Sequence, residues 1–460
     1  MITAKRTNFL ATDLLTTNSL SVTTKSDAPF QAATAPTTVS VSVNGVAAAL
    51  PAYSAVTPVA TGVPLYAAGA AWPQCRGSGV TNAMTGTSDL VGPGAGLSAV
   101  TLVSPALNFS FSSVAVDSTN NVYAVTTSGS NALLTKYSSA TVPYTELWSF
   151  TATFIAFSGT HQYAFTPVLG ANNSVYFMTS TGLYSVDATT GALNWLNTLR
   201  GCSVGARGNV LLDHDGNVYC SAQGQVFCVS PTGQTVWQAF IPRYLLSLSL
   251  DDNTGVLYGV MAGIDNNSES NSGGLFLLDA RSGTPLQTVD QSALLSMTDD
   301  ARLSIQCPIV GQNYVFVNVQ RVLFAFTKQG LLAWSVRRFN PIGSIAYNPR
   351  LDRLYVTEVT DANTTVPQKV AIAALAGTTG VTLFTSTVVT ANSLLAQPII
   401  DANDNVYVFE TGNQVRVFTA DLTLLSTVVQ ALTLGRTPPL AFDVNGKLLI
   451  ATSTGIYRSN

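Results

Sequence analysis

The chain has 460 residues, of which 47% are hydrophobic and only 10% are charged, and its 21 basic and 24 acidic side chains give a formal net charge of −3. Since an average soluble domain carries about 25% charged residues, Ser, Thr, Asn and Gln must cover much of this surface, and the scattered Lys and Arg residues exclude the basic stripe that binds nucleic acid. No apolar run reaches the roughly 18 residues of a membrane-spanning helix, which excludes a transmembrane span of that kind.

Residues 1–70 are rich in Thr, Ser, Ala, Val and Pro, and their alternating stretches such as TTVSVSVNG favour extended strand. The first twenty residues contain two early basic side chains, but Thr, Asp and Asn interrupt the apolar run, so no secretory signal peptide is predicted. We therefore expect an extended N-terminal arm over residues 1–70, a lead-in segment over 71–105 and a repeat domain over 106–460.

A turn of Asp, Asn or Gly followed by a branched or aromatic run recurs eight times after residue 100, as in DSTNNVYAV, DHDGNVYCS and DANDNVYVFE. The anchors of these runs are Tyr123, Tyr176, Tyr219, Tyr258, Phe316, Tyr355, Tyr407 and Leu449. Their separations of 39 to 58 residues are typical of four-stranded propeller blades with loops of variable length. The sequence predicts an all-β, eight-bladed β-propeller. A seven-bladed ring of the WD type is the alternative, although the paired GH and WD signature of that type is absent.

A glycine turn with an aromatic residue four positions later follows four of the eight anchors, as in Gly191 with Trp195 and Gly233 with Trp237. Gly283 is instead followed by Gln287, and the first repeat supplies its tryptophan without the glycine. Because a single blade cannot bury both of its faces, we expect these aromatic side chains to pack between adjacent blades. The predicted blade-locking residues are Trp148, Gly191, Trp195, Gly233, Trp237, Gly330, Trp334 and Phe384.

The last repeat, KLLIATSTGIYRSN, ends after its third strand and so lacks an outermost strand. The segment ALNFSFSS, at residues 106–113 just before the first repeat, is predicted to supply that strand and close the ring. Closure of this kind removes the exposed sheet edges that promote aggregation.

The segment WPQCRGSGVTNAMTG, at residues 72–86, and the repeated motif SVDATTGALNW resemble the pyrroloquinoline-quinone-like (PQQ-like) repeat propellers, and the resemblance extends from residue 72 to the end of the chain. That family includes quinoprotein alcohol dehydrogenases and outer-membrane assembly scaffold lipoproteins. The resemblance implies that Trp72, Pro73, Arg76 and Gly77 lead into the propeller.

The quinoprotein members of the family hold a central calcium with acidic and amide side chains, place an Asp base beside the quinone and usually have two adjacent cysteines. No two cysteines are adjacent here, and acidic residues such as Asp401 and Asp404 stand in turns, where a carboxylate caps backbone N–H groups. The sequence therefore predicts no catalytic, cofactor-binding or metal-binding residues. A calcium loop at Asp213, Asp215 and Asn217 is the alternative, although Gly224 stands where such a loop has its bidentate Glu.

Several other polar side chains have two interpretations. The four arginines Arg337, Arg338, Arg350 and Arg353 form a local basic cluster that either binds an anionic partner or is a solvated loop patch. The two histidines, His161 and His214, fall in loops and support no catalytic triad. The five cysteines contain no CxxC pair and are predicted to be free thiols, with a Cys220–Cys228 bond across neighbouring strands as the alternative. Those cysteines are Cys75, Cys202, Cys220, Cys228 and Cys307.

The arm carries the functional prediction. An extended arm buries too little surface to offset its ordering entropy, so it must pack on its own ring or on a neighbouring subunit, for example by strand addition to a sheet edge. We therefore predict a non-catalytic structural protein that assembles with copies of itself through the arm, and with other structural proteins, in a virus particle or another extracellular assembly. Two alternatives stay open: a quinoprotein-like oxidoreductase and an envelope protein-assembly scaffold.

Overall fold

The computed structural model describes residues 20–22, 41–43, 46–48, 66–68, 70–72, 85–104, 113–128, 130–153, 166–199, 209–222, 224–241, 244–262, 273–290, 308–319, 322–338, 342–359, 369–386, 389–390, 398–410, 414–429, 440–452 and 454–460. The chain divides into two compact units, Met1–Thr57 and Pro58–Asn460. In the first unit the strands β1 (Leu20–Val22), β2 (Val41–Val43) and β3 (Val46–Ala48) form an antiparallel sheet in the order β1-β2-β3. The predicted arm thus contains a small sheet, and β2 lies in the TTVSVSVNG stretch.

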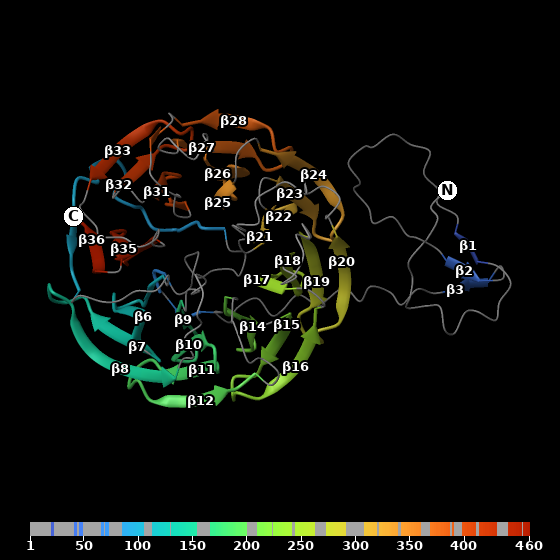
Figure 1. Ribbon diagram of the computed structural model, residues 1–460, viewed down its shortest axis with the longest axis horizontal. Coiled ribbons are helices and arrows are strands. Elements are labelled where there is room, and N and C mark those ends of the chain that lie inside the picture. Colours follow the sequence, from blue (N-terminus) through green and yellow to red (C-terminus); the bar gives the residue numbers. More distant parts are fainter. Residues whose placement is uncertain are drawn as a thin grey trace. The chain divides into compact units, whose positions relative to one another are not determined.

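The second unit is a ring of eight sheets, which we call blades 1 to 8 in chain order (Figure 1). Blade 1 comprises β5 (Ala115–Val116), β6 (Val122–Ser128), β7 (Asn131–Ser138) and β8 (Thr145–Thr153). Blade 2 comprises β9 (Val168–Leu169), β10 (Ser174–Thr179), β11 (Gly182–Asp187) and β12 (Leu193–Asn197). Blade 3 comprises β13 (Leu211–Leu212), β14 (Val218–Ala222), β15 (Gln225–Val229) and β16 (Thr235–Phe240). Blade 4 comprises β17 (Tyr244–Asp251), β18 (Val256–Ala262), β19 (Gly273–Asp279) and β20 (Pro285–Asp290).

The remaining blades repeat this antiparallel order. Blade 5 comprises β21 (Ile309–Val310), β22 (Tyr314–Val319), β23 (Val322–Thr327) and β24 (Leu332–Arg337). Blade 6 comprises β25 (Ile342–Asn348), β26 (Arg353–Val359), β27 (Lys369–Ala376) and β28 (Thr382–Thr385), with β29 (Val389–Thr390) also paired to β27. Blade 7 comprises β30 (Ile399–Ile400), β31 (Val406–Glu410), β32 (Gln414–Phe418) and β33 (Leu424–Val429). Blade 8 comprises β34 (Leu440–Phe442), β35 (Leu448–Thr452), β36 (Gly455–Ser459) and β4 (Val100–Leu102). The predicted all-β, eight-bladed fold is confirmed, and the seven-bladed alternative is wrong.

The position of a strand within its blade decides how it is buried. Every residue of β10 is buried, whereas β12, the outermost strand of the same blade, alternates between exposed and half-buried positions. Blades pack face to face, so their second strands are covered on both sides and their sequences are continuous branched and aromatic runs. These runs are the eight anchors recognised in the sequence.

The outermost strand of blade 8 comes from the start of the ring, as predicted, but from a different segment. β4 pairs antiparallel with β36, with Thr101 opposite Arg458, whereas the predicted donor was residues 106–113, most of which lie outside the described residues. A strand that occupied the rim as far as residue 113 could not reach β5, the innermost strand of blade 1, at Ala115. Three strand spacings separate rim and centre, about 14 Å, and one extended residue spans only about 3.4 Å. The earlier position of β4 leaves enough chain to cross the blade.

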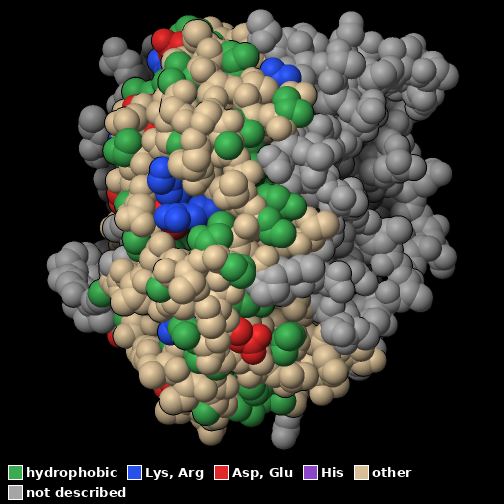
Figure 2. Space-filling view, turned by 90° about the vertical axis from the view of Figure 1, so that its left-hand side faces the viewer, with side chains coloured by type: hydrophobic (Ala, Val, Ile, Leu, Met, Phe, Trp, Pro, Cys, Tyr) green, Lys and Arg blue, Asp and Glu red, His purple; other side chains and the backbone are tan. Residues whose placement is uncertain are grey.

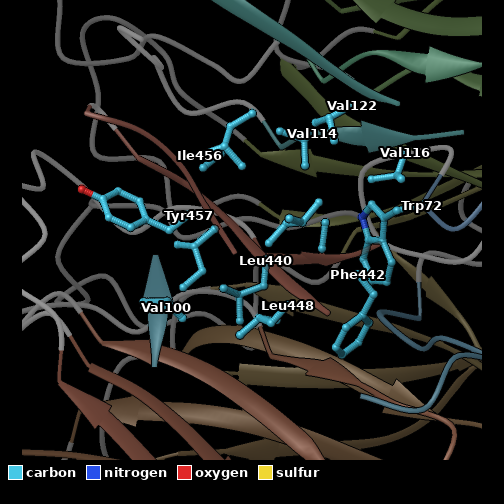
Figure 3. Close-up of a cluster of buried hydrophobic side chains, with 14 of the residues drawn as sticks. Trp72, Val100, Val114, Val116, Val122, Leu440, Phe442, Leu448, Ile456 and Tyr457 are labelled. Atoms are coloured by element: carbon cyan, nitrogen blue, oxygen red, sulfur yellow. The ribbon is translucent and has the colours of Figure 1, made fainter. Parts of the chain in front are cut away.

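A large apolar cluster seals the junction where the ring closes, and it joins residues from both ends of the propeller (Figure 3). Val100 on β4 is 2% exposed, Leu440 and Ile456 of blade 8 are buried in the same cluster, and Val122 comes from blade 1. The ring is therefore held shut by side-chain packing as well as by the β36–β4 pairing.

The outer surface has few charges. In Figure 2, which faces the side of the ring that carries β36, single apolar side chains are scattered among uncharged polar atoms and small groups of charged side chains. In the described part of the chain no helix is long and apolar enough to cross a membrane. The η1 helix (Gly94–Gly96) is a single 3₁₀ turn.

Candidate functional site

The turn between the first and second strands of several blades is built around one aspartate. In blade 3, Asp213 Oδ1 accepts the backbone N–H groups of Asp215 (2.9 Å) and Asn217 (2.8 Å). Its Oδ2 accepts the Asn217 amide (2.9 Å) and the Tyr219 hydroxyl (2.7 Å). Asp117 and Asp401 make the corresponding bonds in blades 1 and 7. The recurring sequence D-x-x-x-N-V-Y therefore specifies a closed hydrogen-bonded turn.

The fourth residue of each of these turns has a left-handed backbone. It is Asn120 (φ 65), Gly216 (φ 78) or Asp404 (φ 63), which are residue types that tolerate positive φ. Asp404 is therefore not the capping carboxylate that the sequence predicted: its Oδ1 accepts Arg350 Nε (2.8 Å) and the Asn348 amide (2.7 Å) of blade 6. It joins two blades instead.

The tyrosines of these turns are held as neutral phenols. Burial, followed by the nearby Asp213 carboxylate, raises the pKa of Tyr219 far above its usual value, and burial followed by Asp401 does the same for Tyr407. Burial acts to raise the pKa of Asp117, but hydrogen bonds from Asn121 and Thr119 together hold it below its usual value. In each turn the tyrosine hydroxyl donates a hydrogen bond to the aspartate carboxylate, so both groups are engaged within the turn.

The centre of the ring is lined by the chain's own lead-in residues, which we call the central segment (described residues of 66–97). Ala67 N donates to Leu169 O (3.0 Å) at β9, and Trp72 exchanges two backbone hydrogen bonds with Val116 on β5 (3.2 and 2.8 Å). Farther along, Thr85 O accepts Tyr347 N (2.9 Å) at β25. The segment then reaches blade 7, where Ser88 N donates to Ile400 O (2.8 Å) and Ile400 N to Gly86 O (2.9 Å). It therefore adds to the inner edges of blades 2, 1, 6 and 7, and the blue chain in Figure 1 crosses the middle of the ring.

Two glycines anchor this segment to the turn of blade 7. Gly92 N donates to Asp401 Oδ2 (3.1 Å) and Gly94 N donates to Tyr407 Oη (2.8 Å). A Cβ on Gly92 would lie 2.4 Å from Tyr407 Oη, so no larger residue fits without a shift. Asp401 is fully buried and its carboxylate accepts five hydrogen bonds.

Trp72, from the motif that carried the family resemblance, is fully buried in the closing cluster. Its ring lies edge-on to Phe442 of blade 8, with centroids 5.9 Å apart and planes at 75°, as Figure 3 shows. Its indole N–H has no hydrogen-bond partner among the described residues. The other three motif residues, Pro73, Arg76 and Gly77, lie outside the described residues.

The structure places each blade-locking tryptophan against the glycine of the next blade. A Cβ added at Gly191, Gly233, Gly283 or Gly380 would lie 2.5 to 2.8 Å from the nearest atom of Trp148, Trp195, Trp237 or Trp334, respectively. Each indole N–H also donates to a backbone carbonyl of that neighbouring turn, at 2.8 to 3.2 Å. One tryptophan thus joins two blades by packing and by a hydrogen bond.

Two junctions use other residues in this position. At Gly330 a Cβ would meet Gln287 Oε1 at 3.1 Å, and here Tyr258 Oη donates to Lys328 O (2.8 Å) across the junction. Between blades 6 and 7, Leu422 (φ 61) takes the place of the glycine, and the smaller ring of Phe384 packs with it in one cluster. Leu422 is larger than the glycine of the other junctions, and Phe384 is correspondingly smaller than the tryptophan.

The predicted basic cluster is largely consumed by this packing. Arg353 lies over the Phe384 ring, 5.1 Å from its centroid, and donates to Ala420 O (3.2 Å) and Asp421 Oδ1 (2.6 Å). It supplies the cross-blade donor that Phe384 lacks. Arg350 pairs with Asp404 and Arg338 with Glu358. These three arginines connect strands and blades, and Arg337 also has an interaction partner.

The side chains of the alternative calcium loop at Asp213 and Asn217 are already engaged in hydrogen bonds within the turn. Both oxygens of Asp213 already accept hydrogen bonds from the turn, and the side chain of Asn217 donates to one of them. Over the described residues no group of three or more His, Cys, Asp or Glu side chains could hold a metal ion. His214 has an interaction partner, and His161 lies outside the described residues.

Cys220 and Cys228 are buried free thiols, so the alternative of a bond between them is wrong. They lie on paired strands, but Cys220 is opposite Phe227 and Cys228 is opposite Tyr219. Burial, followed by the charge of Asp213, raises the pKa of Cys228 to about 12, so this thiol is unreactive. Cys75, Cys202 and Cys307 lie outside the described residues.

Sequence reasoning missed the residues that hold the central segment. Gly92 and Gly94 had no recognised role, and Asp401 was treated as one turn carboxylate among several. The signal was present in GPGAG, at residues 92–96, because closely spaced glycines mark a close backbone approach. Their partner could not be identified, because Asp401 lies about three hundred positions along the chain.

No protein-family model matches the sequence, and no curated protein matches it either. Several solved structures share its fold. Quinohemoprotein alcohol dehydrogenase from Comamonas testosteroni superposes with a TM-score of 0.61 at 12% identity, over 86% of this chain and 81% of that one. BamB from Moraxella catarrhalis gives a TM-score of 0.52 at 16% identity, over 79% of this chain and 97% of that one.

A second quinohemoprotein alcohol dehydrogenase, ADHIIG from Pseudomonas putida HK5, gives a TM-score of 0.57 at 11% identity, over 84% of this chain and 76% of that one. Identities this low establish the fold and nothing about chemistry. The resemblance stated from the sequence is confirmed at that level: the chain has the eight-bladed architecture of the PQQ-like repeat propellers.

Proposed function

We propose that this chain is a non-catalytic structural propeller that assembles with copies of itself, with residues 1–57 contributing a contact to neighbouring copies. A dense extracellular assembly such as a virus particle is the proposed setting, and other structural proteins are its further partners. The observation that carries the non-catalytic part is the central segment. It occupies inner sheet edges of four blades, where a ligand of a propeller enzyme would approach.

The side chains around that segment support the same proposal. Asp401 and Tyr407, which contact the segment, accept hydrogen bonds from the backbone N–H groups of Gly92 and Gly94, respectively. A carboxylate that accepts several hydrogen bonds and is fully buried is poorly placed to take a proton from a substrate. This arrangement of Asp401 and Tyr407 supports a structural role for the two side chains and not a catalytic one.

The N-terminal unit supports the assembly part. Its sheet has only three strands of three residues each, and sheets this small need packing against another surface to be stable. Two of its strands, β1 and β3, are sheet edges within the described residues. Strand edges with uncharged sequences such as LSV and VAA are suited to join another sheet.

The test compares full-length protein with a version that lacks residues 1–57, by mass photometry over a range of concentrations. We expect assemblies larger than one chain for the full-length protein and a shift to smaller species for the shortened one. Full-length protein that stays monomeric at every concentration would contradict the proposal.

A second candidate, an oxidoreductase of the quinoprotein type, is favoured by the fold similarity to two alcohol dehydrogenases. Incubation with pyrroloquinoline quinone and calcium, followed by a dye-linked alcohol oxidation assay, tests it directly. Turnover above that of the quinone alone would replace the structural proposal. The scaffold alternative, which the BamB-like fold favours, predicts instead that the ring retains other envelope proteins in a pull-down with defined partners.

A further inference from the structure

The junction between blades 7 and 8 has a serine where most junctions have a locking aromatic side chain. In blades 3 and 5 the blade-locking tryptophan pairs with the residue just before the bulge of the third strand, and in blade 7 the residue at that place, Val417, pairs with Ser426. The third and outermost strands of blade 8, β36 and β4, are not consecutive in sequence, so no hairpin joins them and no hairpin glycine can receive an indole. Another element must therefore hold this junction.

That element is the strap, which we define as residues 86–104: the end of the central segment followed by β4. Figure 1 shows it in light blue, running from the centre of the ring to the rim and then beside β36. Leu97 O accepts a hydrogen bond from the hydroxyl of Ser426, the residue at the locking position of blade 7. Val91 O lies against Gly446 in the turn of blade 8, where an added Cβ would be 1.9 Å from that oxygen. The strap thus contacts both blades.

Blade 7 binds the strap through six hydrogen bonds, and every one of them is made to the strap's backbone. Three use backbone groups of blade 7 and three use its side chains. The blade 7 groups are Ile400 N and O, Ala402 N, Asp401 Oδ2, Tyr407 Oη and Ser426 Oγ. Their partners on the strap are Gly86 O, Ser88 N, Leu90 O, Gly92 N, Gly94 N and Leu97 O. Main-chain hydrogen bonds of this kind are how a sheet edge holds an extended peptide.

The strap's side chains determine which peptide fits. Leu97, Val100 and Val103 are each 2% exposed and lie in the closing cluster, so three apolar side chains spaced three residues apart fill the space beside blade 8. Gly92 must stay small, because a Cβ there would lie 2.4 Å from Tyr407 Oη. The site therefore selects an extended segment with one required glycine and apolar side chains five, eight and eleven residues after it.

We propose that blades 7 and 8 form a binding site for an extended peptide, and that the strap occupies this site as a ligand from within the chain. Release of the strap would leave the Asp401 carboxylate, the Ile400 backbone and the edge of β36 unpaired, and an unpaired edge accepts an added strand. A second copy of this chain supplies the matching segment in trans, since the seated strap already shows that its backbone and side chains fit. The inference goes beyond the proposed function, because the site lies within one chain and does not involve residues 1–57.

The test uses a full-length protein whose strap is weakened while its site is intact. Gly92→Ala introduces the clash with Tyr407, and Gly96→Ala is the matched control on the same strap, because a Cβ on Gly96 meets nothing within 4 Å. Circular dichroism and thermal unfolding establish that both proteins fold. Fluorescence anisotropy then measures the binding of a labelled synthetic peptide of residues 86–104.

We expect Gly92→Ala protein to bind the peptide at least tenfold more tightly than the wild type, whose own strap competes at a high effective concentration. Gly96→Ala protein should bind as the wild type does. The same peptide carrying Gly92→Ala should bind the released site at least tenfold more weakly than the unaltered peptide. If Gly92→Ala protein does not fold, Leu97→Ala protein takes its place with the same expectation, since it removes only part of one buried strap side chain.

Two results would overturn the inference. A folded strap variant that binds the peptide no more tightly than the wild type shows that releasing the strap opens no binding site. Equal binding of the peptide and its Gly92→Ala form shows that the peptide attaches elsewhere. Mass photometry of wild-type protein separates this inference from the proposed function, because wild-type protein that stays monomeric contradicts self-assembly, whereas tight peptide binding by the strap variant still establishes the site.

Discussion

The indole ring of Trp237 in blade 3 fills the space that a side chain would need at Gly283 in blade 4: a Cβ built on Gly283 would lie 2.5 Å from Trp237 Cε3. Gly283 also has a φ of +70, a backbone conformation that L side chains rarely adopt. Two independent reasons therefore favour glycine at this position: the positive φ of its own backbone and the close approach of the Trp237 ring from the neighbouring blade.

Replacement of that glycine should distinguish the cost of backbone strain from the cost of the clash with the Trp237 ring. We expect Gly283→Ala to lower the free energy of unfolding by about 2–4 kcal/mol, from backbone strain and the clash with the ring. Gly330→Ala is the matched control, because φ is +84 but its Cβ would meet the flexible Gln287 side chain at 3.1 Å. The control should lose only about 1–2 kcal/mol. Urea unfolding measures both, and equal losses would mean that the indole contact adds nothing.

Among the turn aspartates, Asp401 should cause the largest loss of stability when it is replaced. Asp401→Asn keeps the shape but places an N–H₂ group among five donors, so we expect a loss of about 3 kcal/mol or more. Asp213→Asn alters the same kind of turn without a contact to the central segment. Amide hydrogen exchange at Gly92 and Gly94 distinguishes the two variants, since it should accelerate in Asp401→Asn alone. Faster amide exchange at Gly92 and Gly94 in both variants would contradict a direct anchoring of the central segment by Asp401.

Alkaline pH should unfold the ring through its buried tyrosines. Burial raises the pKa of Tyr355 to about 12. Burial, which outweighs the opposing charge of Arg458 and is aided by Asp443, raises the pKa of Tyr144 to about 12 as well. The folded state therefore keeps protons that the unfolded state releases near the ordinary tyrosine pKa of 10.0. The contribution of these phenols to stability should be constant below that pH and should fall as the pH rises from about 10 toward 12.

Urea unfolding at a series of pH values measures this loss, and tyrosinate absorbance measured in parallel reports ionisation. The two changes should coincide, because the phenols ionise only once the blades separate. Full ionisation of all tyrosines while the circular dichroism spectrum stays native would disprove the linkage.

The β4 strand should close the ring through one face only. Val100→Asp introduces a charge at a position that is 2% exposed in the closing cluster, and we expect it to cost several kcal/mol. Thr101→Asp, one residue later on the exposed face of the strand, should stay within about 0.5 kcal/mol of the wild type. Thermal unfolding and limited proteolysis compare the two, and equal sensitivity would show that β4 does not pack as described.

Much of the fold could be predicted from local sequence because the same short turn and hairpin motifs recur along the chain. The Asp of D-x-x-x-N-V-Y closes its own turn, and the glycine four residues before Trp195 or Trp237 takes a positive φ within its own hairpin. These are short-range effects, so eight copies were visible as a period. The Arg353 contact with Phe384 was not visible, because a cross-blade contact of that kind has no local signal.

The sequence by itself determined the strand type, the number of blades and the residues at which neighbouring blades meet, since turn chemistry and side-chain alternation act over a few residues. Only the tertiary structure decided which segment closes the ring and where the central segment pairs. Short uncharged strands such as VTL at β4 pair with any open edge of suitable geometry, so the choice among edges depends on chain reach and on side chains hundreds of residues away.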